Sequence, residues 1–359
     1  MDLQTGKMLN KRDSASGRGR MEYIDALRGF TMLLVIMCHV ELVLNYDGYS
    51  FNAVLAEFRM PLFFFISGFV LYKANFNWNK RNTWSFIRRK FWPQLFGPTL
   101  FLLFICYTKG VDLFSAFISD SRYGYWFTYM LFEFYVFYIL IHWLVSVFHL
   151  KPVAHELLIV LAGLAITAYS FYINHKLAQS GSADGIIYAI GVQKWCYFIY
   201  FIMGSRLRKY YTHYRYYMDK HDALVTICMC LFFVFNLFRD FLVEFSTIVS
   251  YLVTGFAGII LCFEFFRKHE RTFSSNTVVG GWMQYVGRRT LDVYLIHYCV
   301  FYSGFFSPFR NVIKGNNPFG EFLLTFVIAA VCVAICLVIS CVLRMSSMVA
   351  RYVFGARKV

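Results

Sequence analysis

The sequence predicts an all-α fold: a polytopic membrane helical bundle of about ten transmembrane helices, with both termini in the cytoplasm. Hydrophobic residues make up 59% of the 359 residues and charged residues only 15%, whereas soluble domains average about 45–50% and about 25%. Apolar stretches of about 20 residues recur along the chain, and Lys and Arg gather between alternate stretches. This composition excludes ordinary soluble enzymes, disulfide-rich secreted scaffolds and disordered regulators.

Ten apolar stretches are long enough to cross a bilayer as helices. In chain order they are residues 24–45, 54–73, 91–108, 125–148, 156–174, 188–206, 222–238, 244–266, 282–304 and 321–343. Pro61 in the second stretch, and Pro93 and Pro98 in the third, are predicted to kink their helices and open space between neighbours. The connecting loops leave no room for a separate soluble domain. The predicted organisation is a basic cytoplasmic arm at 1–21, a membrane domain at 22–345 and a basic cytoplasmic tail at 346–359.

The basic residues assign each loop to one side of the membrane. Twenty-seven of the 35 Lys and Arg fall in the two terminal segments and in the loops that share their side. Cytoplasmic loops carry the excess of Lys and Arg, so both termini are predicted to be cytoplasmic. The asymmetry persists through ten crossings, which a wrong span count would have scrambled. Eight basic residues fall on the opposite side: Arg59, Lys109, Arg122, Lys176, Lys194, Arg239, Arg310 and Lys314.

The net charge of +15 does not predict a nucleic-acid partner, because the basic residues lie between apolar stretches instead of on one solvated face. The ten Cys lie almost entirely within apolar stretches, where a thiol behaves as a small hydrophobe. Neither the Cys228 and Cys230 pair nor the Cys332 and Cys336 pair has further ligands at metal spacing. The sequence therefore predicts no metal site and no disulfide framework. Membrane lipid is the expected partner of the apolar stretches.

The first stretch carries the ionisable residues Asp25, Arg28 and His39. The eleven residues from Arg28 to His39 bring the helix within about 20° of three full turns, so both side chains share a face, about 16 Å apart. Asp25, three residues before Arg28, can pair with it. Charged groups inside a bilayer are functional by default. An Arg28 that reaches the head groups and a His39 bonded to a neighbouring helix are the structural alternative.

Four short motifs follow one another at helix ends. They are Asp25-Ala26-Leu27-Arg28-Gly29 with its spacing to His39, the segment 60–69 ending in Ser67-Gly68-Phe69, the segment 86–93 containing Arg88-Arg89, and the segment 287–297. Together they resemble acyltransferase family 3, the integral-membrane O-acyltransferases of surface carbohydrates, over about residues 22–345. Where that family often has a further arginine, this chain has Trp92.

The resemblance implies a ten-helix enzyme of the cell membrane, that is, the cytoplasmic or inner membrane. It implies that a cytoplasmic acyl-CoA, most often acetyl-CoA, donates its acyl group to a hydroxyl of a cell-surface polysaccharide or lipid-linked sugar. Arg28 and His39 are the catalytic residues expected on this basis. His39 would act either as the base toward the acceptor hydroxyl or as an acyl carrier.

Cations at cytoplasmic helix ends are the expected binding site for the phosphates of the donor. They are Arg28, Arg88, Arg89 and Arg288, with Arg289 as a further candidate. The pair Arg88 and Arg89 would also suit anchoring to anionic lipid. Its combination with Arg28 favours donor binding.

The remaining candidates are expected to line the path of the substrates. They are Arg59, Ser67, Tyr294 and His297. Tyr294 and His297, three residues apart, share a helix face, although His297 equally suits a hydrogen-bonded core position. Ser67 is expected to serve close helix packing first and substrate lining second. Arg59 is expected either to contact the acceptor sugar or only to cap the outer surface.

Other readings of the same residues stay open at this point. Asp292 can pair with Arg288 one turn earlier, and Glu133 receives no role. A transporter or flippase for a lipid-linked sugar or anionic solute would also use intramembrane charges and broken helices, but no inverted repeat is apparent. A structural subunit of a glycan-assembly complex would tolerate changes at Arg28 and His39. Neither the acceptor sugar nor the oligomeric state follows from the sequence.

Overall fold

The structure, a computed structural model, is helical without strands over the residues that it describes. These residues are 20–44, 51–74, 76, 78–148, 150–180, 185–221, 223–306, 308 and 318–356. Most of the predicted arm at 1–21 lies outside them, as do Arg310, Lys314, the side chain of Arg239 and the last three residues of the predicted tail.

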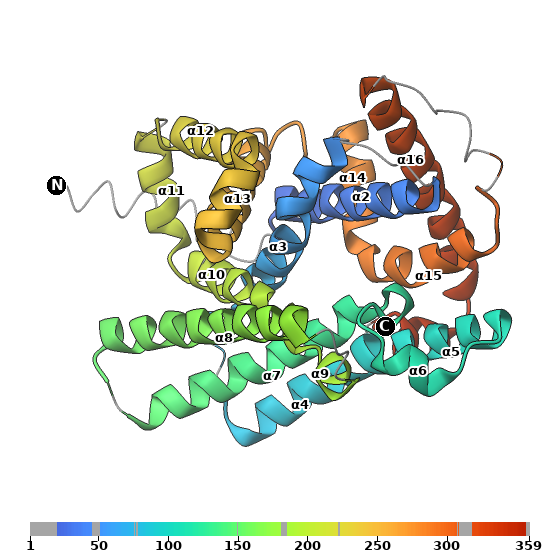
Figure 1. Ribbon diagram of the computed structural model, residues 1–359, viewed down its shortest axis with the longest axis horizontal. Coiled ribbons are helices and arrows are strands. Elements are labelled where there is room, and N and C mark those ends of the chain that lie inside the picture. The colour runs from blue at the N-terminus through green and yellow to red at the C-terminus, as the bar shows by residue number, and fades with distance from the viewer. Residues whose placement is uncertain are drawn as a thin grey trace.

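One group of helices gathers around the first helix, α2 (Glu22–Leu44). Figure 1 shows α2 running beside α14 (Val278–Arg288), α15 (Thr290–Tyr302) and α16 (Pro318–Leu343). The N-terminal and C-terminal parts of the chain are therefore brought together, which places the first and the last of the four sequence motifs side by side.

A second group gathers around α3 (Phe51–Leu71). It comprises α10 (Phe198–Lys209), α11 (Tyr211–Lys220), α12 (Ala223–Leu237) and α13 (Arg239–Lys268). α3 contacts α2, α10 and α13, so it joins the two groups at the centre of the molecule (Figure 1).

A third group forms the lower layer of Figure 1. The chain passes from α4 (Lys80–Phe91) through a π-helical turn, η1 (Trp92–Phe96), into α5 (Gly97–Lys109). Short elements then lead to the long helices α7 and α8, which lie side by side (Figure 1). The other elements are α6 (Leu113–Ile118), η2 (Arg122–Gly124), α7 (Trp126–Val147), α8 (Pro152–Ser180), α9 (Gly185–Ile190), η3 (Val192–Tyr197) and η5 (Val349–Val353), the last against η1.

Two glycine crossings bring the central helices into backbone contact. At the α2–α14 crossing, a Cβ on Gly29 would lie 2.0 Å from the carbonyl oxygen of Met283. At the α3–α10 crossing, a Cβ on Gly68 would lie 1.9 Å from the carbonyl oxygen of Phe201. Without a hydrophobic driving force between helices in lipid, such close approach supplies the packing energy. The crossings fix α2 and α3, which carry Arg28, His39 and Ser67.

Seven helices within the described residues are long and apolar enough to cross a membrane, and the protein is a multi-pass membrane protein. They are Glu22–Leu42, Val54–Leu71, Lys80–Lys109, Trp126–Val147, Pro152–Gln179, Ile248–Lys268 and Phe319–Leu343. The prediction of a long apolar helix is confirmed for these seven stretches. The count of ten and the cytoplasmic placement of the termini stay predictions.

The other three predicted stretches are interrupted or short. Stretch 188–206 is divided among α9, η3 and α10, and stretch 282–304 breaks at Arg289 between α14 and α15. Stretch 222–238 contains α12, whose axis is bent by 90° from that of α11. Hydropathy marks these segments as apolar, but it does not register where tertiary packing breaks a helix.

Candidate active site

A cavity of about 320 Å³ opens between α2, α3, α4 with η1, α7 and α15. Its wall combines apolar side chains, mainly from α3 and α7, with hydroxyl, amide and cationic groups. Lys73 follows the end of α3, whereas Phe127 and Thr128 lie at the start of α7. The cavity is mixed in polarity, which suits a ligand that has both charged and neutral parts.

Three cations line the cavity: Arg28, Lys73 and Lys90. One guanidinium nitrogen of Arg28 donates to the Thr290 hydroxyl at 3.1 Å. The Lys90 ammonium lies 3.4 Å from the Tyr135 hydroxyl and 4.8 Å from the centre of that ring. The lining residues in the described part of the chain include no Asp or Glu. Three positive charges without a carboxylate among these lining residues make the cavity electropositive, which suits an anionic ligand.

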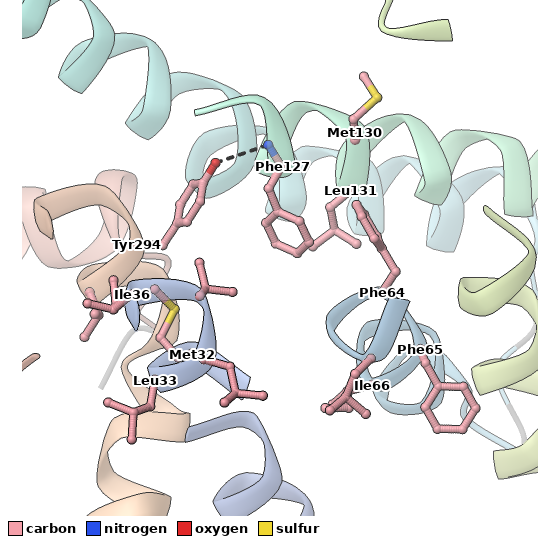
Figure 2. Packing of buried hydrophobic residues seen from close by; sticks show 14 of the residues in the cluster. Met32, Leu33, Ile36, Phe64, Phe65, Ile66, Phe127, Met130, Leu131 and Tyr294 are labelled. Atoms are coloured by element: carbon pink, nitrogen blue, oxygen red, sulfur yellow. Dashed lines mark hydrogen bonds between the residues drawn. The ribbon is translucent and has the colours of Figure 1, made fainter. Parts of the chain in front are cut away.

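Tyr294 is held rigidly in the cavity wall. Its hydroxyl accepts a hydrogen bond from the backbone N–H of Phe127 at 3.1 Å and donates to the carbonyl of Gly124 at 2.7 Å. Figure 2 shows Tyr294 directed toward Phe127, with buried side chains of α2 such as Met32 and of α3 such as Phe64 nearby. The hydroxyl is satisfied from both sides, so the ring serves as a fixed surface.

Beyond Tyr294 lies a cluster of His39, His297 and Tyr298, called here the histidine cluster. The centre of the His297 ring is 5.9 Å from that of Tyr294, and the rings of His39 and His297 stack with centres 5.2 Å apart. Nε2 of His39 lies 2.9 Å from the Tyr298 hydroxyl. The cluster therefore adjoins the cavity through Tyr294 and joins α15 to α2.

His297 is fully buried and uses only one of its two ring nitrogens. Nδ1 lies 3.0 Å from the carbonyl oxygen of Val293, so we assign the ring proton to Nδ1. Nε2 is buried without a hydrogen-bond partner among the described residues. Buried polar atoms are nearly always paired, and this unpaired nitrogen lies next to His39.

The turn before α7 packs against Tyr298 of the histidine cluster. Gly124 has φ +95° and a Cβ there would lie 1.8 Å from the Tyr298 ring, so only glycine fits. The preceding Arg122 and Tyr123 also have positive φ, 45° and 52°, which is costly for residues with a Cβ. The Arg122 guanidinium is buried, packs on the Tyr129 ring at 4.6 Å and bonds the Phe117 carbonyl. This anchored turn presses Gly124 against Tyr298.

The structure brings some of the predicted residues together and leaves others apart. Arg28, Ser67 and Tyr294 line the cavity, and His39 and His297 form the adjoining cluster. Arg59 lies on α3 and does not line the cavity. Arg88, Arg89 and Arg288 are exposed and do not line the cavity.

Two predicted ion pairs are wrong. Asp292 pairs with Arg344, which directly follows α16, instead of with Arg288. The two hydrogen bonds of this pair measure 2.6 and 2.8 Å. Asp25 binds Arg20, while Arg28 turns to Thr290. In both cases a residue distant in the sequence or in an irregular segment competes better than the helical neighbour. Periodicity along one helix does not register such partners.

The sequence reasoning missed Lys73, Lys90, Gln94 and Tyr298. Lys90 and Gln94 continue a stripe from Phe86 at four-residue spacing, which is the one signal that was available. Arg88 and Arg89 lie about 200° and 100° around the helix from Lys90, so a run of three cations cannot face one cavity. No sequence pattern distinguished Tyr298 from its neighbour His297.

Glu133, which the sequence left without a role, accepts a hydrogen bond from the Trp195 indole at 3.0 Å. This bond ties α7 to η3, away from the cavity. Within the described residues, no group of three or more His, Cys, Asp or Glu is placed to hold a metal ion.

The fold and the site define a class: a multi-pass membrane protein with a basic cavity that adjoins two histidines, His297 buried and His39 partly buried. Residues 21–341 match the family model described as an acyltransferase domain, that of acyltransferase family 3. Because the match spans nearly the whole chain, the protein belongs to this family and is an acyltransferase. No significant match was found among curated proteins or among solved structures.

Proposed function

We propose that the protein is a membrane O-acyltransferase of the cytoplasmic or inner cell membrane. It moves an acyl group, acetyl in the first instance, from cytoplasmic acyl-CoA to a hydroxyl of a cell-surface polysaccharide or lipid-linked sugar. The observation that carries the proposal is the cavity lined by Arg28, Lys73 and Lys90 without a carboxylate, which adjoins His39 and His297 through Tyr294.

The charge of the cavity supports a phosphorylated donor. Coenzyme A bears several phosphate charges at one end and a neutral thioester arm at the other. Arg28, Lys73 and Lys90 would bind the phosphates as charge-assisted partners. The apolar and hydroxyl-bearing wall between them and Tyr294 suits the neutral arm. The thioester would then lie beside the histidine cluster.

The reaction joins an acceptor oxygen to the acyl carbonyl carbon and breaks the carbon–sulfur bond. In the direct route, His39 takes the proton of the hydroxyl as the oxygen attacks, and returns it to the departing thiolate. In the carrier route, a neutral His39 nitrogen attacks first and the thiolate leaves. The acceptor oxygen then displaces the imidazole and loses its proton to the thiolate.

The contact between Tyr298 and His39 supports one ring nitrogen of His39, Nδ1, as the reacting atom. The Tyr298 hydroxyl engages Nε2 at 2.9 Å, so Nδ1 is the nitrogen that remains for the substrate. A proton on Nε2 that is donated to the Tyr298 oxygen leaves Nδ1 with its lone pair, the form that both routes require. Tyr298 is thus a positioning residue in either route.

The test is acyl transfer by the purified protein in lipid nanodiscs. Radiolabelled acetyl-CoA is supplied, and release of free CoA is measured chromatographically with and without lipid-linked sugar. We expect CoA release that depends on the protein and labelled acetyl on the sugar fraction. Base-labile acetyl on surface glycans should also vanish in a deletion strain and return with the wild-type gene. Unchanged acetyl together with altered glycan export would contradict the proposal and favour transport.

A further inference from the structure

The cavity contains a buried side-chain amide whose oxygen is unpaired within the described part of the chain. Gln94 lines the cavity, is 9% exposed, and its Oε1 has no hydrogen-bond partner among the described residues. The hydroxyls of Ser67, Thr128 and Thr290, which line the same cavity, all have partners. An unsatisfied buried acceptor costs about 1–3 kcal/mol, so its retention in a cavity points to a ligand that completes it.

Local backbone geometry directs Gln94 into the cavity. It lies in the π-helical turn η1, where the N–H of Gly97 bonds the carbonyl of Trp92 five residues earlier. Pro93 has no N–H to give to the carbonyl four residues before it, which favours such a turn. Because α4 continues into this turn, Gln94 follows Lys90 by one turn, and both face the cavity. A cation and a neutral acceptor are thus set in sequence along one wall.

The chemistry of the atom restricts what binds there. A carboxamide oxygen accepts hydrogen bonds only from N–H or O–H groups, so phosphate anions bound by Arg28, Lys73 and Lys90 cannot satisfy it. The neutral pantetheine arm of coenzyme A carries two secondary amides between its phosphates and its thioester. We propose that Gln94 binds the N–H of one of these amides and so sets how far the thioester reaches toward the histidine cluster. This inference rests on the proposed function, because it takes the donor to be an acyl-CoA.

Binding of modified coenzyme A tests the inference without altering the protein. Two analogues are used, each with one arm amide replaced by an ester, which removes the N–H and retains the shape. Dissociation constants of CoA and of both analogues are measured by calorimetry on the wild-type protein in nanodiscs. We expect one ester to weaken binding about 5–150-fold, which is the equivalent of about 1–3 kcal/mol, and the other to bind like CoA.

The variant Gln94→Leu removes the proposed partner from the protein, as the ester analogues remove it from the ligand. It should weaken CoA binding by a similar factor and should bind CoA and the sensitive ester equally, because the partner of the N–H is gone. Thr99→Val removes a hydroxyl one turn further along, outside the cavity lining, and should keep the wild-type discrimination. The inference about Gln94 is wrong, and the proposed function stands, if CoA binds but both esters bind as tightly as CoA. The same holds if Gln94→Leu still binds CoA more tightly than the sensitive ester. If the wild-type protein binds no CoA, the proposed function fails first.

Discussion

Two buried polar clusters in this protein differ in how completely their atoms are paired. In the first, on α7, α8 and α10, Arg206 donates to Glu156 at 2.7 Å, to Tyr138 at 2.9 Å and to Ser205 at 3.2 Å, and lies 3.0 Å from Nε2 of His142. In the histidine cluster, Nε2 of His297 has no partner among the described residues.

The difference separates structural from chemical roles. A fully satisfied buried network rigidifies the fold, and every member depends on the others. A cluster with an open nitrogen bears an energetic cost, which a ligand that bonds to that nitrogen would remove. We therefore propose a structural role for the Arg206 cluster and a chemical role for the histidine cluster, and the following changes test that division.

The largest effect is expected for His39→Ala. Loss of the base or acyl carrier should lower acyl transfer about 10²–10⁴-fold, the usual contribution of such a group, with unchanged thermal stability. His142→Ala, in the Arg206 cluster, is the matched control and should retain turnover per folded molecule. Initial rates with acetyl-CoA at equal amounts of folded protein give the comparison. Full transfer activity in His39→Ala would eliminate both routes proposed for His39.

The opposite pattern is expected for Arg206→Met. Removal of one partner from a buried ion pair typically costs about 3–5 kcal/mol. Because Lys209 still neutralises Glu156, we expect the lower end, about 3 kcal/mol, with turnover retained. Thermal unfolding and denaturant titration of the purified protein measure it. A variant that is as stable as the wild type but inactive would place this cluster in the chemistry and remove the distinction.

A smaller effect distinguishes the cations inside the cavity from those outside it. Lys90→Met should raise KM for acetyl-CoA about 10–100-fold, because hydrogen bonds to charged groups contribute about 1.5–3 kcal/mol. Arg88→Met, on the exposed face of the same helix, should change KM little, since surface charges are screened. Steady-state kinetics at fixed ionic strength give both values. Equal effects of the two substitutions would extend the donor site onto the surface of α4.

The contrast between Lys90 and Arg88 also shows what the sequence could predict. Hydropathy located the first helix well, 24–45 against Glu22–Leu44, because a long apolar stretch is a strong local signal. Spacing identified Arg28, which lines the cavity, and His39, which adjoins it. Hydropathy and residue spacing are properties of a single helix, so they can be determined without knowing which helices pack against it.

Other properties depend on contacts between distant segments and could not be predicted in this way. The break at Arg289 divides stretch 282–304 at the glycine crossing, where a Cβ on Gly287 would meet the carbonyl of Asp25 at 1.8 Å. The partner of Asp292 lies 52 residues away. Which residue of the run Arg88-Arg89-Lys90 faces inward depends on how α4 sits on α7. Sequence motifs therefore pointed to helices that line the cavity, but not to every side chain that faces it.

The smallest effect expected is that of Tyr298→Phe, and it tests the geometry within the histidine cluster. The change removes one hydrogen bond, about 0.5–1.5 kcal/mol, and retains the ring that packs on His39 and Gly124. We expect kcat to fall about threefold to tenfold with KM for acetyl-CoA unchanged, because we propose that the phenol orients His39, and the phenol does not line the cavity.

The control for this change is Tyr302→Phe, one turn further along α15, which should leave kcat unaltered. If Tyr298→Phe also leaves kcat unaltered, Nε2 of His39 is not held by the phenol during turnover, and Nδ1 loses its assignment as the reacting nitrogen. If kcat falls and KM rises together, the tyrosine contacts the donor itself. The cavity would then extend into the histidine cluster, and the open nitrogen of His297 would lie within reach of the substrate.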